Sequence, residues 1–140
     1  NQIDNAAVHC AAAIGAECQI ETTKGFYPLD QSRALSNILR PHMITCVGET
    51  AIIDEQKSFA AGDLGDISLF KPTIQFGFSG CKGTVHGRDF MMENSLEALI
   101  YPVYVLHNSI MDMLNDPDKT RQIKESYKPK MSKETYFETI

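Results

Sequence analysis

Apolar side chains recur at helical spacing near the start of the chain and then alternate with polar ones. In residues 3–14, small apolar side chains share one face, which predicts a helix that can lie close against a sheet. Gly15 is placed to supply the left-handed residue that ends this helix. Residues 17–23 alternate apolar and polar side chains, which predicts a half-buried strand.

The middle of the chain predicts a second helix and a core strand. Residues 31–39 have the helical pattern, and Pro41 is expected to stop that helix. A brief strand is expected at 51–54 and one helical turn at 67–70. Residues 73–79 form the strongest strand pattern, with Ile74, Phe76 and Phe78 on one face. Alternating helices and strands predict an α/β fold with helices packed on a mixed sheet.

The last third of the chain predicts helices. Asn94, with Glu97 three positions later, is typical of a helix start, and Pro102 predicts a kink or a break. Asp116 and Pro117 predict the N-cap and first residue of another helix, and a polar, loosely held tail is expected from 128 onward. The inward face of the long helix is expected to contain Leu99, Val103, Leu106, Ile110 and Met113.

Composition narrows the classes of protein to consider. With 140 residues, 43% of them hydrophobic and 22% charged, the chain is long enough for one domain with its own core. A net charge of -5 argues against nucleic-acid binding. The four cysteines form no CxxC pair, which favours reduced thiols and a cytoplasmic protein. No apolar run reaches the roughly 20 residues needed to cross a membrane.

Side chains that could bind a ligand or take part in catalysis gather in residues 60–90. Asp63 and Asp66 lie in a glycine-rich loop, where they are ligands, substrate-orienting groups or turn formers. His86 lies in a second glycine-rich loop and is either a metal ligand, an acid or base, or a surface histidine. Beside it, Arg88 is placed to bind a substrate carboxylate and Asp89 to orient the imidazole. The alternative is that Arg88 and Asp89 form a surface ion pair.

Cys81 offers a third chemistry, because a thiol nucleophile can use a nearby histidine as its base. It precedes His86 by five positions, but the sequence supplies no evident third group to orient the pair. No HxH, HxxxH or HExxH motif accompanies His86 either, so local spacing does not complete a metal site.

The run AAGDLGDISLFKPTIQFGFSG followed by GTVHGRDF resembles the C-terminal portion of the zinc-dependent amidohydrolase and exopeptidase family. This family includes aminoacylases, glutamate carboxypeptidases and p-aminobenzoyl-glutamate hydrolase. Its TDxGDxS-like loop corresponds here to residues 62–68, with Gly62 in place of the usual threonine. The resemblance covers nearly the whole chain and extends to the GFYPL run at 25–29, which is similar to the exit from the family's lid domain.

The resemblance implies a division of the chain and a set of site residues. Residues 1–24 would end the lid, or dimerisation, domain with its last helix and strand, 25–127 would form the C-terminal half of a di-zinc catalytic domain, and 128–140 would be a tail. His86 would be a metal ligand, and the substrate-binding residues would be Asp63, Gly65, Asp66, Ser68 and Arg88.

Relatives in this family hold two metal ions with an HxD motif, a bridging Asp and a Glu-Glu pair, which are missing from these residues. Zinc or another divalent metal is therefore expected in a full-length parent that hydrolyses N-acyl amino acids or dipeptide-like amides. The chain alone, read as a fragment of a larger protein, is expected to bind zinc weakly and to be inactive. The alternative is a non-catalytic binding or oligomerisation module. Either way we expect a homo-oligomer, because a partial scaffold exposes apolar surface and strand edges.

Overall fold

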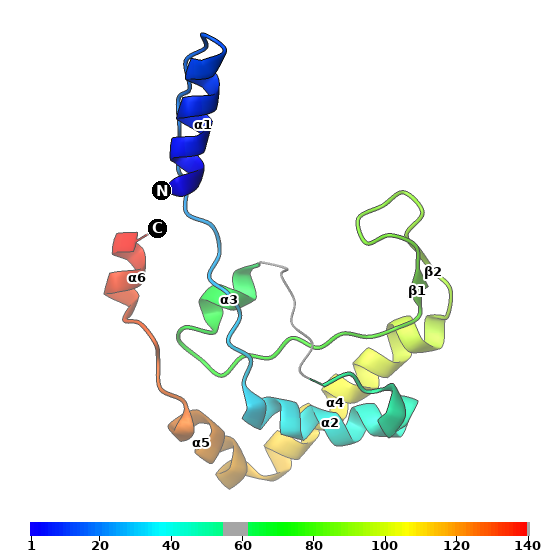
Figure 1. The fold of residues 1–140 in the computed structure, drawn as a ribbon. Coiled ribbons are helices and arrows are strands. Elements are labelled where there is room, and N and C mark those ends of the chain that lie inside the picture. The colour runs from blue at the N-terminus through cyan, green and yellow to red at the C-terminus, as the bar shows by residue number, and fades with distance from the viewer. Residues whose placement is uncertain (55–61, 140) are drawn as a thin grey trace.

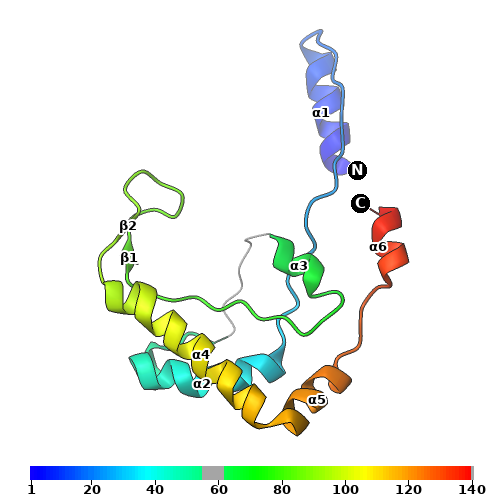
Figure 2. The same ribbon diagram turned by 180° about the vertical axis from the view of Figure 1, so that it is seen from behind.

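The structure is a computed structural model that describes residues 1–54 and 62–139. The beginning of the 60–90 stretch, at residues 60 and 61, lies outside the described residues. The described residues are rich in helix and contain one small antiparallel sheet, so the α/β expectation is confirmed only in its general form. Figures 1 and 2 show a floor of helices from which an N-terminal arm and a hairpin rise on opposite sides.

The N-terminal arm is helix α1 (Gln2–Ala13) followed by an extended segment. The Asn1 side chain accepts hydrogen bonds from the backbone N–H groups of Ile3 and Asp4, which caps the helix start. Gly15 has φ 72°, as predicted for the helix end. No residue of α1 is buried, so its small-residue face does not pack on a sheet. The strand predicted at 17–23 is wrong, because that segment forms no ladder with any described strand.

Helices α2 (Arg33–Val47) and α4 (Tyr101–Asn115) form the floor of the molecule and enclose its core. Ile38, Leu39 and Val105 are buried where the two helices meet. Partly buried side chains packed against them are Met43, Cys46, Ile74, Phe76, Met113 and Ile123. The apolar face of α2 and two side chains of the 73–79 segment therefore supply the core, as their patterns suggested.

Pro41 does not end helix α2, which corrects the prediction of a short helix at 31–39. A proline inside a helix costs about 3 kcal/mol, because it removes one backbone donor and crowds the preceding turn. The residues on either side of Pro41 pack on α4, with Leu39 buried and Met43 partly buried. This tertiary packing offsets the local cost and carries the helix on to Val47.

The long C-terminal helix begins as a π-helical segment, η2 (Leu96–Ile100), and continues as α4. The predicted irregularity at Pro102 lies at this change, because Pro102 has no N–H to continue the regular ladder. The predicted inward face is wrong for Leu99, Val103, Leu106 and Ile110, which are 45 to 65% exposed. The buried face of the helix instead carries Ala98, Val105 and Ser109.

The remaining elements are short. They are η1 (Glu49–Ala51), α3 (Asp63–Ile67), β1 (Cys81–Lys82), β2 (Met91–Met92), α5 (Pro117–Ser126) and α6 (Lys133–Thr139). Asp116 caps α5 through its bond from the Lys119 N–H, as predicted. The strand predicted at 51–54 is wrong, since residue 51 ends a 3-10 turn over 49–51 and the residues after it form no described strand. The strand predicted at 73–79 is also wrong, because among the described residues this segment forms only a single parallel bridge, Gln31 to Thr73.

One polar contact joins the two floor helices. His42 Nε2 lies 2.7 Å from Asp112 Oδ2, and the His42 ring meets the Tyr104 ring edge to face at 6.4 Å. The His42 side chain is 18% exposed, so the contact is partly shielded from water.

We expect His42→Ala to lower the free energy of unfolding by about 1 kcal/mol, because it removes a part-shielded hydrogen bond and a ring contact between α2 and α4. Urea unfolding followed by circular dichroism measures the change. Arg121→Ala is the control, since the Arg121–Asp118 pair lies within α5 and is largely exposed and should contribute less than about 0.5 kcal/mol. Equal losses in the two variants would contradict the role assigned to His42.

Candidate functional site

Helix α3 carries most of the predicted substrate-binding residues and lies directly against residues 27–30. Gly65 is buried, and a Cβ at this position would lie 1.7 Å from the Tyr27 carbonyl oxygen. Only glycine permits such a close approach of two backbones. The glycine of the GDLGDIS run is therefore required by packing at this point.

The Asp66 carboxylate binds two other parts of the chain. Its Oδ1 accepts a hydrogen bond from the Tyr27 N–H at 2.9 Å. Its Oδ2 accepts one from the Tyr136 hydroxyl of α6 at 3.1 Å. Partial removal from water and the bond to Asp66 raise the pKa of Tyr136, so this phenol keeps its proton further into alkaline solution than a free tyrosine does. Asp66 thus joins α3 to the segments before and after it.

Ser68 is fully buried just after α3. Its hydroxyl donates to the Gly65 carbonyl at 2.6 Å and accepts from the Asp30 N–H at 3.0 Å. Its carbonyl accepts a hydrogen bond from the Tyr127 hydroxyl. These bonds satisfy a polar side chain that would be costly to bury alone, and they hold residues 30 and 127 against the turn.

The C-terminal segment, expected to be a loose tail, is bonded to the same turn. The Lys130 N–H donates to the Leu69 carbonyl at 2.9 Å, and Lys130 Nζ lies 2.8 Å from Asp30 Oδ2. The Tyr136 ring packs against Phe70 with centroids 5.4 Å apart. Helix α6 therefore docks beside α3, as Figure 1 shows.

A hollow of about 380 Å³ opens beside α3. Its lining residues are Leu29, Gly62, Asp63, Leu64, Gly65, Ile67 and Gln75. Two predicted substrate-binding residues, Asp63 and Gly65, are among them, and the volume falls in the usual range for small-molecule sites. Asp66 and Ser68 do not line the hollow, and their bonds run to other parts of the chain.

His86 lies in the loop of the β1–β2 hairpin, whose strands pair Cys81 with Met92 and Lys82 with Met91. It is exposed and has φ 64°, an uncommon conformation for a residue other than glycine. No hydrogen bond joins Asp89 to His86 among the described residues; Asp89 Oδ2 instead accepts from the Thr84 N–H at 3.0 Å and from the Thr84 hydroxyl at 3.4 Å. The carboxylate therefore shapes the loop that presents the imidazole.

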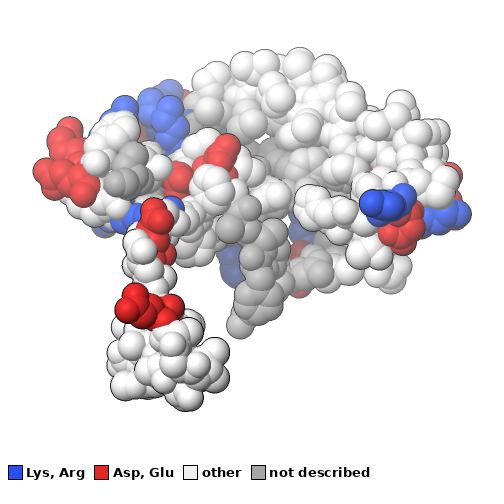
Figure 3. Space-filling view, turned by 90° about the horizontal axis from the view of Figure 1, so that it is seen from above, with Lys and Arg blue, Asp and Glu red and all other residues white. Residues whose placement is uncertain are grey.

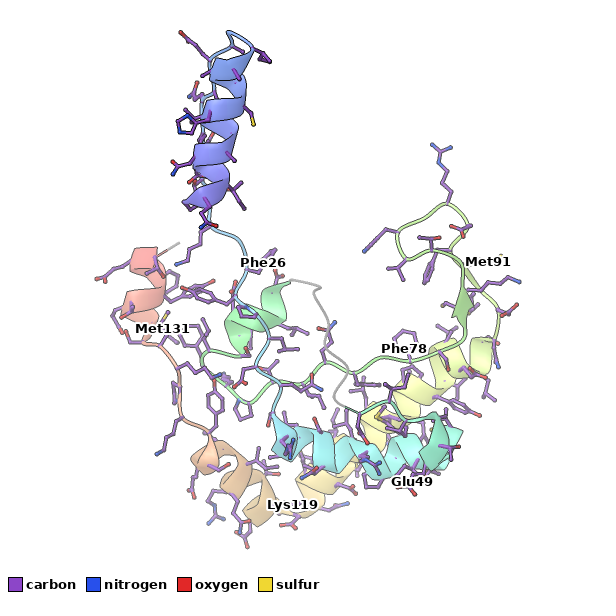
Figure 4. The ribbon with its side chains drawn as sticks, in the orientation of Figure 1. Phe26, Glu49, Phe78, Met91, Lys119 and Met131 are labelled. Carbon is purple, nitrogen blue, oxygen red and sulfur yellow. The ribbon has the colours of Figure 1, made fainter. Side chains whose placement is uncertain are left out.

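The hairpin lies at one edge of the described structure, well apart from α3. Figure 4 places Met91, at the hairpin, far from Phe26 and Met131, which lie on the side of α3 and α6. The structure thus brings Asp63, Gly65, Asp66 and Ser68 together but leaves His86 and Arg88 apart from them. The metal-ligand and substrate-contact roles of these residues stay predictions.

The residues 1–54 and 62–139 contain no group of three His, Cys, Asp or Glu side chains placed to share one metal ion. Zinc needs three or four protein ligands, so the described donors do not assemble a zinc site around His86. No helix in those ranges is long and apolar enough to cross a bilayer.

Sequence reasoning missed the tyrosines that hold the site. Tyr27, Tyr127 and Tyr136 all contact the α3 turn, although the last two lie in or beside a stretch interpreted as a polar tail. Aromatic residues recurring in that polar stretch were a usable signal, because exposed tails rarely need large rings.

Comparison with known proteins assigns this chain to no family. No protein-family model matches the chain, and neither curated proteins nor solved structures gave a match.

We expect Gly65→Ala to lower the free energy of unfolding by about 3 kcal/mol, because the new methyl group would overlap the Tyr27 backbone. Urea unfolding measures the loss. Gly25→Ala is the matched control, since a Cβ there meets nothing within 4 Å. A Gly65→Ala protein as stable as the Gly25→Ala protein would contradict the close approach.

We expect Tyr136→Phe to loosen α6 while the rest of the chain stays folded, because it removes only the hydroxyl that donates a hydrogen bond to Asp66. Loss of one such bond, about 1 kcal/mol, should raise amide hydrogen exchange in residues 133–139 about fivefold. Tyr101→Phe is the control, because no described hydrogen bond involves the Tyr101 hydroxyl. Unchanged exchange in Tyr136→Phe would show that the bond to Asp66 does not hold the helix.

Proposed function

We propose that this chain is the C-terminal part of a metal-dependent amidohydrolase that hydrolyses N-acyl amino acids or small dipeptide-like amides. The GDLGDIS and GTVHGRDF runs carry the resemblance on which the proposal is based. The observation that best supports it is the hollow beside α3, which Asp63 and Gly65 help to line. A site of that size suits a small amide substrate.

Two further observations are compatible with the proposal. The internal bonds of Asp66 and Ser68 hold the α3 turn rigidly, and a rigid wall positions a substrate better than a mobile loop does. His86 stands exposed on a hairpin loop, where it is accessible to ligands carried by another polypeptide segment.

The catalytic parts that the family requires would come from outside these 140 residues. A metal ion held there would supply an activated water and polarise the amide carbonyl. Within this chain, His86 would contribute one ligand, Asp63 and Gly65 would line the substrate site, and Arg88 would contact a substrate carboxylate.

The second candidate function is a non-catalytic binding or oligomerisation module on the same scaffold. It is favoured by the large exposed apolar side chains of the hairpin and α4, including Met91, Met92 and Val103. The two candidates differ in whether metal and turnover appear when the chain is joined to the rest of its parent.

We expect the 140-residue chain alone to bind zinc without defined stoichiometry and to release no amino acid from N-acetyl amino acids or dipeptides, since one histidine does not hold a catalytic ion. Isothermal titration with zinc and an amine-release assay measure the two properties. Tight one-to-one binding or turnover by this chain would overturn the idea that it needs further ligands.

We expect a longer polypeptide containing this chain and its native upstream sequence to hydrolyse such amides. His86→Ala should then lower kcat/KM by at least about 100-fold and reduce the bound metal, because a lost ligand weakens the ion's coordination. His9→Ala on exposed α1 is the matched control and should change neither value. A folded longer polypeptide with neither metal nor turnover would favour the non-catalytic module.

A further inference from the structure

The walls of the hollow beside α3 are mostly apolar. The side chains of Leu29, Leu64 and Ile67 line it, and the last two are 37 and 46% exposed. Gly62 and Gly65 line it without adding a side chain. Since methylene groups gain free energy when they leave water for an apolar surface, these walls suit the alkyl part of a ligand.

Two polar side chains complete the lining, those of Asp63 and Gln75. Within residues 1–54 and 62–139, no hydrogen bond or ion pair engages the Asp63 carboxylate or the side-chain amide of Gln75. The Gln75 backbone N–H, by contrast, donates to the Gln31 side chain. No lining residue is basic. The hollow therefore offers a carboxylate and an amide oxygen that can accept hydrogen bonds from a ligand.

The charge of Asp63 is balanced less well than that of several other carboxylates. Glu93 lies 2.8 Å from the Lys82 ammonium group, and Asp30 lies 2.8 Å from that of Lys130. Figure 3 shows acidic and basic side chains side by side in the same way at the end of the molecule that carries the hairpin. No described cation pairs with Asp63, so the hollow carries a net negative charge.

We infer that the hollow beside α3 binds an alkylammonium group of the kind that ends a lysine side chain. The alkyl chain would contact the three apolar walls, and the ammonium group would donate to the Asp63 carboxylate and the Gln75 amide oxygen. A ligand carboxylate would instead meet the like charge of Asp63. This ligand class deepens the proposed function and rests on it for one consequence, that the preferred amides carry a basic side chain near the bond to be cut.

The test is titration of the 140-residue chain, followed by the backbone amide signals of residues 62–67 and 75 in nuclear magnetic resonance. The probes are the methylamides of Nα-acetyl-lysine, of Nα-acetyl-norleucine, which has the alkyl chain without the ammonium group, and of alanine, which has an ammonium group without the alkyl chain. The lysine probe should shift these signals and bind at least about fivefold more tightly than either of the other two, because only it uses both the walls and the carboxylate.

Asp63→Asn should weaken binding of the lysine probe about fivefold and leave binding of the norleucine probe unchanged, because it removes only the charge. Asp63→Glu should restore the affinity, which a merely structural role of Asp63 would not predict. Asp118→Asn is the matched control, since Asp118 pairs with Arg121 on α5 and does not line the hollow. It should leave the dissociation constant of the lysine probe unchanged.

Absence of binding by the lysine probe, equal affinities of the three probes, or equal effects of Asp63→Asn and Asp118→Asn would overturn the inference. That failure would not remove the hydrolase proposal, because the longer polypeptide could still hydrolyse amides without a basic side chain. Conversely, a longer polypeptide with neither metal nor turnover would refute the hydrolase while the lysine probe still bound to the hollow.

Discussion

The close approach of Gly65 to the Tyr27 carbonyl is the contact on which the organisation of this chain depends. It lets the extended segment after the N-terminal arm lie against α3, and the bonds of Asp66 and Ser68 then secure it. The same turn receives Tyr127, Lys130 and Tyr136 from the C-terminal segment. Three parts of the sequence therefore meet at one short helix, and the missing side chain at Gly65 is what lets the segment around Tyr27 come close to it.

The residues of the GDLGDIS motif have two different roles, one in holding the chain together and one in lining a hollow. The side-chain oxygens of Asp66 and Ser68 bond to partners inside the chain, whereas Asp63 and its neighbours Gly62 and Leu64 line an open hollow. A motif that resembles part of an active site thus has a supporting part and an exposed part. The hairpin that carries His86 is held by different bonds and lies apart from α3, at one edge of the molecule. The proposed chemistry therefore requires groups that reach both places.

A small hydrophobic core between α2 and α4 holds much of the remaining described structure together. Ile38, Leu39 and Val105 lie where α2 crosses α4, and a few partly buried side chains surround them. The opposite side of α4 is at least as apolar but stays exposed. Burial of that side would add hydrophobic stabilisation of the kind that the small core supplies only in part.

Local signals in the sequence determined where several helices begin and end. Gly15 ends the first helix because glycine adopts positive φ at little cost, and Asp116 with Pro117 begins another because the aspartate caps free N–H groups. The glycine-rich loops and the general mixture of helix and strand followed in the same way. Such features depend on neighbouring residues only, so the sequence contains the information needed to predict them.

Tertiary contacts decided the rest. Helix α2 passes through Pro41 because its flanking residues pack on α4, and residues 73–79 form no strand ladder with the described residues because a strand needs a partner as well as a pattern. Which apolar face of α4 is buried was likewise settled by α2. The partners of Asp66 and Ser68 are distant in sequence, so only the folded chain could show that these residues hold it together.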